Sequence, residues 1–220
     1  MKQHISFEFS APRNPEETAR LLKVHKKLKV FSPEFFSVTY GAGGSTKEGT
    51  KRAVLNIQQL GSHVAPHLSF GGDKPEKIDA LLREYQKAGV KRVVALRGDM
   101  PSGQITKMTF ARELIEFIRN STGSHFHIDI AAYPEIHPDS ASVESDIKFF
   151  KNKVDAGANS AITQYFYNAD AYFRYMDNCA SCNIDIPIVP GIMPITNYKG
   201  IVRFSKNLSL IHISEPTRPY

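Results

Sequence analysis

Two acidic residues of this 220-residue chain stand in surroundings that suit acid–base chemistry or the stabilisation of a cation. Glu8 lies in the run F-E-F, whose apolar side chains should desolvate the carboxyl and raise its pKa, which suits a general acid near neutral pH. Asp99, in A-L-R-G-D, follows Arg97 by two positions, so both side chains point to the same face of an extended strand. We expect Asp99 to stay ionised beside a developing cation while Arg97 holds an anionic or carbonyl group.

Each of these assignments has a structural alternative. Glu8 is alternatively an edge carboxylate paired with a lysine, and Arg97 with Asp99 is alternatively a plain charge pair. His67, in A-P-H-L, is as often a satisfied core residue as a ligand, whereas His137, in A-A-Y-P-E-I-H-P, lies on a predicted loop, where binding residues concentrate. The sequence G-A-G-G-S-T (residues 41–46) leads into a helix and offers backbone N–H groups to an anion.

Short β-branched or aromatic runs alternate along the chain with longer segments of 3.6-residue periodicity. This alternation predicts strand–helix units around a parallel sheet. The expected strands cover residues 4–10, 35–41, 63–70, 92–99, 127–133, 160–166 and 187–193. Helices lie between them: one is expected to begin at Asn14 with Pro15 in its first turn, and another at Ser45, with Glu48 completing a capping box.

Polar or special residues stand at the end of every expected strand. They are Glu8, Thr39, His67, Arg97 with Asp99, Tyr133 with Glu135, Gln164, and Pro190 with Gly191. Because a (β/α)₈ barrel builds its active site at the carboxyl ends of its strands, we predict an α/β fold of the TIM-barrel class with about seven βα units. The competing fold, an open doubly wound sheet, would carry G-x-G-x-x-G after its first strand, where this chain has S-A-P-R.

The composition is that of an ordinary globular chain. It has 28 Lys and Arg residues against 22 Asp and Glu, a formal net charge of +6 and 41% hydrophobic residues, which excludes disordered and fibrous proteins. No run approaches the roughly 18 apolar residues of a membrane span, and no apolar signal region opens the chain, so we expect a cytoplasmic protein without a membrane partner. The basic run over residues 23–29 fits the solvated face of an amphipathic helix, and we expect no nucleic-acid partner.

The two cysteines, Cys179 and Cys182, are too few for a disulfide framework or for a four-coordinate zinc site. We expect two thiols on a helix surface and no bound metal. A redox-active C-x-x-C pair is the alternative.

Seven motifs stand in one register along the chain: F-E-F, S-V-T-Y-G-A-G-G-S, A-P-H-L, V-V-A-L-R-G-D, A-A-Y-P-E-I-H-P, K-V-D-A-G-A-N-S-A-I-T-Q-Y-F and P-G-I-M-P-I-T-N-Y. In this order they resemble the bacterial-type methylenetetrahydrofolate reductases, over residues 4 to about 207. The resemblance implies a FAD-dependent oxidoreductase of one-carbon metabolism and methionine biosynthesis, acting on CH–NH donors. Such an enzyme oxidises NADH or NADPH and then reduces 5,10-methylenetetrahydrofolate to 5-methyltetrahydrofolate by ping-pong hydride transfer through FAD.

The resemblance also implies a role for each matching residue. Glu8 matches the acid that protonates the folate as its five-membered ring opens to an iminium ion, and Asp99 matches the carboxylate that binds the substrate and stabilises that cation. Gln164 matches a folate-binding glutamine. The positions that match the FAD site are Thr39, His67, Arg97, Gly98, Asp99, Ala131, Tyr133, His137, Asp146 and Lys153, the last two contacting its ribose and diphosphate.

The chain departs from the family pattern at three places. Ser10 and Ala11 stand where the family usually has Phe and Pro, which loosens the rim beside Glu8. Asn152 stands where related enzymes often carry an arginine, which weakens the hold on the FAD diphosphate. Residues 208–220 do not resemble the family's eighth strand. We therefore expect a single barrel domain over residues 1–207 and a tail foreign to the gene, in a truncated reading of a longer protein; a true short variant is the alternative.

Two other functions stay open. A flavin-free lyase or aldolase barrel would usually place a Schiff-base lysine or a metal-binding cluster at a strand end, and the expected strands end in no lysine. Alternatively, the chain is a folding-incompetent fragment or an inactive partner of full-length subunits, because a missing eighth strand leaves two sheet edges unpaired. A full-length protein is expected to form a homo-oligomer, and NADH and NADPH are both candidate reductants.

Overall fold

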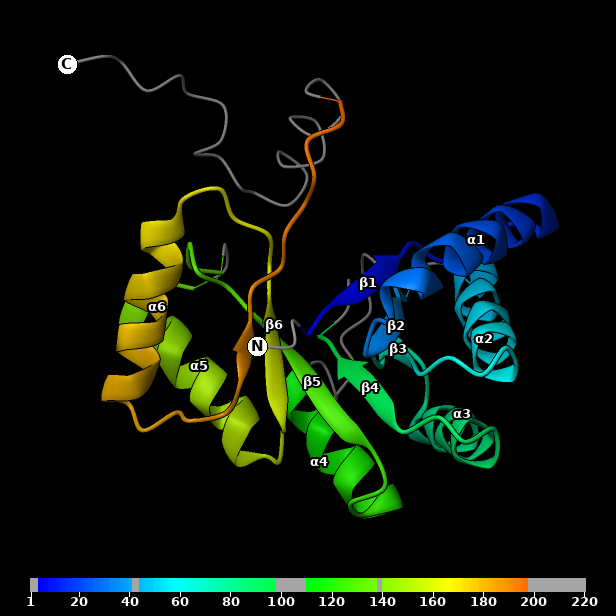
Figure 1. The fold of residues 1–220 in the computed structure, drawn as a ribbon. Coiled ribbons are helices and arrows are strands. Elements are labelled where there is room, and N and C mark those ends of the chain that lie inside the picture. The colour runs from blue at the N-terminus through cyan, green and yellow to red at the C-terminus, as the bar shows by residue number, and fades with distance from the viewer. Residues whose placement is uncertain (1–3, 41–43, 98–109, 138–139, 198–220) are drawn as a thin grey trace. The chain divides into compact units, whose positions relative to one another are not determined.

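The computed structural model describes residues 4–40, 44–97, 110–137 and 140–197, with side chains of the second helix described from residue 47 onward. Strands and helices alternate along these residues (Figure 1). The strands are β1 (Ser6–Phe9), β2 (Phe35–Val38), β3 (Val64–Leu68), β4 (Arg92–Ala95), β5 (His127–Ala132), β6 (Ser160–Thr163) and β7 (Ile188–Val189). The helices are α1 (Pro15–Leu28), α2 (Gly44–Gln59), α3 (Pro75–Lys87), α4 (Ala111–Thr122), α5 (Val143–Asp155) and α6 (Ala169–Ser181), with a 3₁₀ turn, η1 (Lys29–Phe31), after α1.

The order of the strands in the sheet is the order of the strands in the chain, β1 to β7. Every strand pair whose register is defined is parallel. A doubly wound sheet reverses its strand order at a switch point, whereas a (β/α)₈ barrel adds each strand beside the one before it. The predicted α/β fold of the TIM-barrel class is therefore confirmed, and the doubly wound alternative is wrong.

All seven expected strands are present, but each is shorter than the sequence predicts, mostly at its carboxyl end. Thr39 and Gln164, for example, follow their strands and do not lie within them. Polar side chains at these positions lie where the chain leaves the sheet ladder, so β propensity alone extends the strands too far.

The chain divides into two compact units, and each is described by itself. The first comprises residues 1–130 and 155–160, and the second comprises residues 131–154 and 161–220. The expectation of a single barrel domain over residues 1–207 stays a prediction, and the expected foreign tail, residues 208–220, lies outside the described residues.

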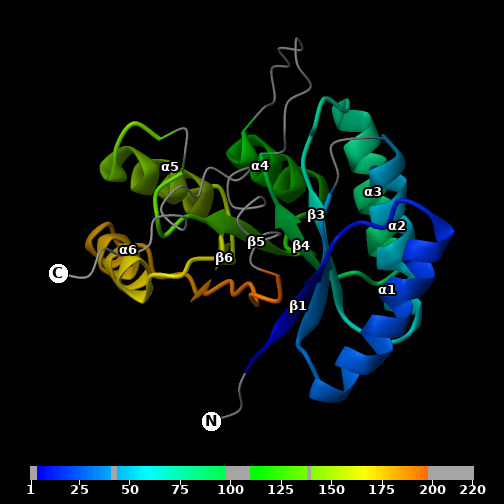
Figure 2. The same ribbon diagram turned by 90° about the horizontal axis from the view of Figure 1, so that it is seen from above.

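In the first unit, helices α1, α2 and α3 lie on the same side of strands β1, β2 and β3 (Figure 2). Helix α1 begins as predicted: Asn14 Oδ1 accepts a hydrogen bond of 2.8 Å from the Glu17 backbone N–H, and Pro15 is the first helical residue. Helix α2 begins at Gly44, so Ser45 lies inside its first turn and the predicted cap at Ser45 is wrong.

The basic run over residues 23–29 covers the end of α1 and the first residue of η1, and its lysines are exposed, as predicted. Val24 is exposed, whereas the imidazole of His25 is buried beside Leu21 and Thr18. His25 replaces Val24 in the core because its ring packs edge-on against Phe36 of β2, with 4.5 Å between ring centroids.

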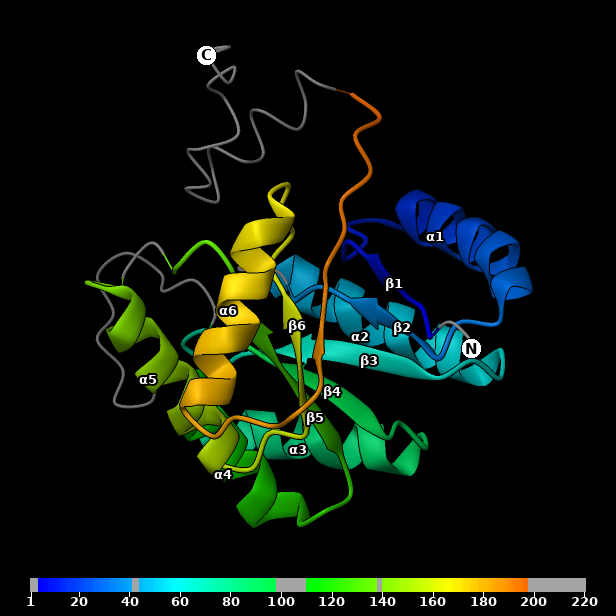
Figure 3. The same cartoon turned by 60° about the vertical axis from the view of Figure 1, so that its left-hand side comes forward.

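In the second unit, α5 and α6 lie side by side (Figure 3) and meet through the rings of Phe150 and Tyr175, whose centroids are 5.7 Å apart. Cys182 is exposed, but Cys179 is buried on the inner face of α6, so the prediction of two surface thiols is wrong for Cys179. Burial, together with nearby negative charge, raises the pKa of the Cys179 thiol to about 11. A thiol with a raised pKa is a poor redox nucleophile, which disfavours the alternative of a redox pair.

Among the described residues, no helix combines the length and the apolar character that crossing a membrane would require.

Candidate active site

Four of the expected site residues of the first unit lie at or just beyond the carboxyl ends of consecutive strands. Glu8 is in β1, Thr39 follows β2, His67 is in β3 and Arg97 follows β4. Because parallel strands end at one edge of their sheet, the fold gathers these side chains there, as a TIM-barrel site requires.

Glu8 and His67 face each other across β2. Glu8 Oε2 lies 3.4 Å from His67 Nε2, and the carboxylate is 56% exposed while the imidazole is only 9% exposed. This is ion-pair distance without hydrogen-bond geometry, because Nε2 has no hydrogen-bond partner among the described residues. His67 is thus buried but not satisfied, and the alternative of a satisfied core histidine is wrong.

The predicted direction of the Glu8 pKa shift is also wrong. Burial raises the pKa of Glu8, but the interaction with His67 and its charge outweighs burial and leaves that pKa below its usual value. The sequence motif F-E-F indicates the apolar neighbours correctly but not the histidine supplied by β3. The structural alternative for Glu8 is a carboxylate paired with a lysine, but its partner in the structure is His67.

The loop after Glu8 is held by the neighbouring βα unit. Thr39 Oγ1 accepts a hydrogen bond of 3.0 Å from the Ala11 backbone N–H, and the Thr39 carbonyl accepts one of 2.6 Å from Thr50 Oγ1. A Cβ atom added to Gly49 of α2 would overlap the carbonyl oxygen of Pro12. The Thr39 hydroxyl therefore holds this loop by a hydrogen bond. Gly49, which has no side chain, leaves room for the Pro12 carbonyl of the same loop.

Arg97 is exposed, and its guanidinium lies over the ring of Phe110, 5.9 Å from the ring centroid. Gly98 and Asp99 lie outside the described residues, so their roles stay predictions. Residues 41–43 of the expected anion loop also lie outside, and residues 44–46 belong to α2.

In the second unit, Lys153 of α5 reaches back to the carboxyl end of β5. Its Nζ donates a hydrogen bond of 2.7 Å to the carbonyl oxygen of Ala131 and lies 5.2 Å from the ring centroid of Phe150. Burial lowers the pKa of Lys153 to about 8, although the charge of Asp146 acts in the opposite direction. A desolvated ammonium with a carbonyl as its hydrogen-bond acceptor favours a nearby anion.

Asp146 organises the loop that follows β5. Its Oδ1 accepts a hydrogen bond of 2.9 Å from Ser140 Oγ, and its Oδ2 accepts one of 3.3 Å from the His137 backbone N–H. The ring of His137 packs edge-on against Tyr133, with 4.5 Å between centroids. Tyr133, His137 and Asp146, expected separately from the sequence, are therefore brought together.

Gln164 follows β6 and is half-buried. Its side-chain Oε1 accepts a hydrogen bond of 3.0 Å from the Tyr165 backbone N–H, which fixes the amide at the strand end. Gly191, after β7, donates its N–H to Thr163 Oγ1 at 2.9 Å, and an added Cβ would overlap the Thr163 carbonyl oxygen. The close approach of these two backbones explains a glycine at this position.

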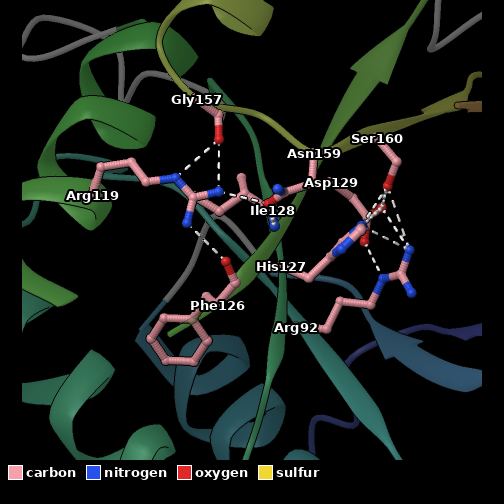
Figure 4. A network of polar contacts seen from close by, with 9 residues as sticks. All are labelled: Arg92, Arg119, Phe126, His127, Ile128, Asp129, Gly157, Asn159 and Ser160. Atoms are coloured by element: carbon pink, nitrogen blue, oxygen red, sulfur yellow. Dashed lines mark hydrogen bonds and ion pairs between the residues drawn. The ribbon is translucent and has the colours of Figure 1, made fainter. Parts of the chain in front are cut away.

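Sequence reasoning missed a polar network at the amino ends of β4, β5 and β6 (Figure 4). Arg92 and Asp129 form an ion pair, and both contact Ser160, which also lies 2.6 Å from His127 Nε2. Arg119 of α4 donates to the carbonyl oxygens of Gly157 and Phe126 at 2.6 to 2.9 Å. Asp129 in the otherwise apolar run H-I-D-I-A-A is the signal that could have revealed the network.

Two open hollows of about 420 and 620 Å³ border this network, lined in part by His63, Lys91 and His127. They lie at the amino ends of the strands, opposite the end that holds Glu8 and His67. Since chemistry in this fold takes place at the carboxyl ends, we assign the network to stability.

A second missed cluster lies near the carboxyl ends of β2 and β3. Asp73 accepts hydrogen bonds from Lys47 at 2.6 Å, Lys77 at 3.0 Å and the Tyr40 hydroxyl at 3.5 Å. The two lysines hold the pKa of Asp73 below its usual value against the effect of burial. The cluster joins the loop after β3 to α2.

Solved structures resemble this chain in fold. A 2,3-dimethylmalate lyase of the PEP mutase/isocitrate lyase superfamily matches with a TM-score of 0.58 and 10% identity, covering 99% of this chain and 84% of that one. A tryptophan synthase from M. tuberculosis matches with a TM-score of 0.56 and 13% identity, covering 86% of this chain and 74% of that one. At such identities the likeness concerns the fold alone.

Sequence relatives are much closer. The 5,10-methylenetetrahydrofolate reductase of Escherichia coli (strain K12) is 38% identical over 203 residues, which cover 92% of this chain and 68% of the relative. The enzyme of the same name from Buchnera aphidicola subsp. Acyrthosiphon pisum is 40% identical over 201 residues, covering 91% and 68%. "Methylenetetrahydrofolate reductase (NADH) 1" of Arabidopsis thaliana is 37% identical, covering 91% of this chain and 37% of its own length. Residues 1–217 match the family model for methylenetetrahydrofolate reductase, and the chain therefore belongs to the methylenetetrahydrofolate reductase family.

Proposed function

We propose that the chain carries the site for flavin-dependent reduction of 5,10-methylenetetrahydrofolate to 5-methyltetrahydrofolate, with NADH or NADPH as the reductant. The observation that carries this proposal is Glu8 at the carboxyl end of β1, half-exposed and 3.4 Å from the buried His67, in a chain of this family. A carboxyl in this place is accessible to a substrate and has a proton partner behind it.

The residues of the second unit fit a flavin dinucleotide. The ammonium of the half-buried Lys153 has the Ala131 carbonyl oxygen as its hydrogen-bond acceptor, and a diphosphate would supply the anion that a desolvated ammonium favours. The pair of Tyr133 and His137 would line the same group, with Asp146 fixing their loop. Bound FAD would supply the transfer of hydride from the nicotinamide to the folate.

The chain's own residues would supply the proton chemistry. Glu8 would give its proton to the folate nitrogen that leaves as the five-membered ring opens, which generates the iminium cation. Asp99 stays the predicted carboxylate that stabilises this cation. Gln164, whose amide is fixed at the end of β6, would orient the folate by hydrogen bonding.

The test is the visible absorption spectrum of the purified 220-residue chain with added FAD, followed by NADH in the absence of oxygen. We expect retained flavin absorption that bleaches with NADH and returns when 5,10-methylenetetrahydrofolate is added. Lys153→Met should reduce flavin retention, whereas Lys23→Met, at an exposed lysine of α1, should not.

Two results would contradict the proposal. A chain that melts cooperatively but retains no flavin would show that the residues present do not make the site. A chain without a cooperative thermal transition would instead support the fragment alternative.

A further inference from the structure

Glu8 and His67 meet although their strands are not neighbours in the sheet. Glu8 of β1 pairs in register with Ser37 of β2, and Ser37 pairs with Ala65 of β3. His67 lies two residues beyond Ala65, so its side chain emerges on the same face. Because Ser37 and Ala65 are small and buried, nothing on the intervening positions separates the carboxylate from the imidazole.

His67 has a ring nitrogen without a hydrogen-bond partner beside this carboxylate. Its Nε2 has no hydrogen-bond partner among the residues that the structure describes, and Glu8 Oε2 lies 3.4 Å from it. Buried polar atoms are nearly always hydrogen-bonded when their role is to support the fold. His25 Nδ1 and the Tyr85 hydroxyl also lack a partner among these residues, so the role of His67 rests on the Glu8 carboxylate 3.4 Å from its Nε2.

Two described cations near this end of the first unit have other partners. Lys47 bonds to Asp73, and the guanidinium of Arg97 lies over Phe110. Among the described side chains, His67 is the one whose charge acts on Glu8. Among the described residues, burial and His67 therefore set the protonation of Glu8.

We propose that His67 is a positioning residue that controls the proton of Glu8, keeping the carboxyl ionised in the free chain and transferring a proton to it when a ligand covers the pair. In the step itself the Nε2–H bond of the imidazolium breaks and an O–H bond forms at Glu8 Oε2. An ion pair becomes a neutral imidazole beside a neutral carboxylic acid. The proton then goes from Glu8 to the leaving nitrogen of the folate, and water re-protonates the pair after product release. The transfer of the proton from Glu8 to the folate rests on the proposed function.

A ligand that covers the pair causes the proton transfer because the ion pair needs water around its charges more than the neutral pair does. The carboxylate is 56% exposed, so water still reaches part of it, although burial already acts to raise its pKa. A flat ligand stacked over it would remove that water, and desolvation disfavours the ion pair relative to the neutral pair. Glu8 thus becomes an acid at the moment when a substrate is in place.

The first test needs no catalysis. The pH titration of the Glu8 carboxyl, followed by ¹³C NMR of glutamate-labelled protein and assigned with Glu8→Gln, is compared between the wild type and His67→Gln. We expect the Glu8 midpoint to move up by about one pH unit or more in His67→Gln, because burial remains and the cation is gone. His63→Gln, at an exposed histidine just before the same strand, is the control and should leave the midpoint unchanged. An unchanged midpoint in a folded His67→Gln protein overturns the proposal.

The second test uses the wild type and does not depend on the fold of a variant. Calorimetric titration with 5-methyltetrahydrofolate near pH 6, in buffers of different ionisation enthalpy, measures protons taken up on binding. Internal transfer predicts almost no uptake, whereas uptake of about one proton per ligand from the buffer overturns the proposal. If no folate binds, the proposed function fails, and the carboxyl titration still decides the role of His67.

Discussion

Arg92 of β4 and Asp129 of β5 form a bidentate ion pair. Arg92 Nε lies 2.6 Å from Asp129 Oδ2, and Arg92 Nη2 lies 3.1 Å from Oδ1. The carboxylate is only 1% exposed. Burial raises the pKa of Asp129, but the contacts with His127, Arg92 and Ser160 outweigh burial and hold that pKa below its usual value. A buried charge that depends on so few partners makes the fold sensitive to their removal.

Arg92→Met should lower the free energy of unfolding by about 3–5 kcal/mol, because it leaves a buried carboxylate without its cation. Urea denaturation at pH 7 measures the change. The contribution of Asp129 is present above its unfolded pKa, since the folded value is the lower one, and is lost as the pH falls through the folded value.

Arg83→Met is the matched control for this prediction. Arg83 pairs with Asp79 at 2.7 Å, but its side chain is 61% exposed, so its loss should cost less than about 1 kcal/mol. The double variant Arg92→Met, Asp129→Leu should recover most of the stability, because it removes both charges together. Equal losses from Arg92→Met and Arg83→Met would refute the assignment of Arg92 to a buried pair.

The sequence predicts the repeated strand–helix unit because burial of a parallel sheet imposes apolar runs at regular spacing, and those runs are visible one strand at a time. It also predicts that Glu8, Thr39 and His67 end their strands. What it does not predict is which of these residues meet across the sheet. The partner of Glu8 comes from a strand 59 positions later, so the local motif F-E-F gives the desolvation and misses the opposing charge.

Asp129 shows the same limit of sequence-based prediction. Its neighbours in the chain are apolar, and its ion-pair partner Arg92 belongs to another strand, so neither residue looks like part of a network when its own segment is considered. His25 shows a similar limit, because its type and position in α1 favour the apolar Val24 as the buried residue, whereas the structure buries His25. Tertiary contacts decide both cases.

His25 should make the fold acid-sensitive. The imidazole is buried against Phe36, its Nε2 lies 3.0 Å from Ser62 Oγ, and its Nδ1 has no hydrogen-bond partner among the described residues. Burial, with a smaller effect of the Lys29 charge, lowers the pKa of His25. The unfolded chain therefore binds more protons below the usual histidine pKa of about 6.5, and stability should fall as the pH drops through that value towards the folded pKa.

Thermal melting at pH 5 and at pH 7.5 measures this effect. His25→Gln, which cannot be protonated, should lose less stability between the two pH values than the wild type does. His63→Gln, at an exposed histidine, should show the wild-type difference. A pH dependence that survives in His25→Gln would assign the acid sensitivity to another group.

Gly49→Ala should destabilise the chain although the residue lies within α2. An alanine in a helix is normally more stable than a glycine by about 0.5–1 kcal/mol. Here the added methyl group would overlap the Pro12 carbonyl oxygen, so either the helix or the loop after Glu8 must move. Overpacking of this kind costs about 1–3 kcal/mol, which reverses the usual sign.

Denaturant unfolding of Gly49→Ala beside Thr39→Val separates the two constraints on this loop. Thr39→Val removes the hydroxyl that accepts the Ala11 N–H and keeps the shape of the side chain, so it should cost about 1 kcal/mol. A stabilised Gly49→Ala protein would mean that the loop after Glu8 does not occupy the space beside α2.

Lys153 should react with amine reagents at a lower pH than an ordinary lysine. Burial lowers its pKa to about 8, so half of the amine is unprotonated near that pH, whereas an ordinary lysine needs about 10.4. Competitive labelling with acetic anhydride, read by mass spectrometry at Lys153 over pH 6 to 10, measures the midpoint.

If Lys153 holds the diphosphate of FAD, flavin retention should weaken as the pH rises through about 8, because the anion then loses its positive partner. Lys153→Arg should move that loss to higher pH, since a guanidinium keeps its proton throughout this range. Retention that is independent of pH from 7 to 9 in the wild type would show that the charge of Lys153 does not hold the cofactor.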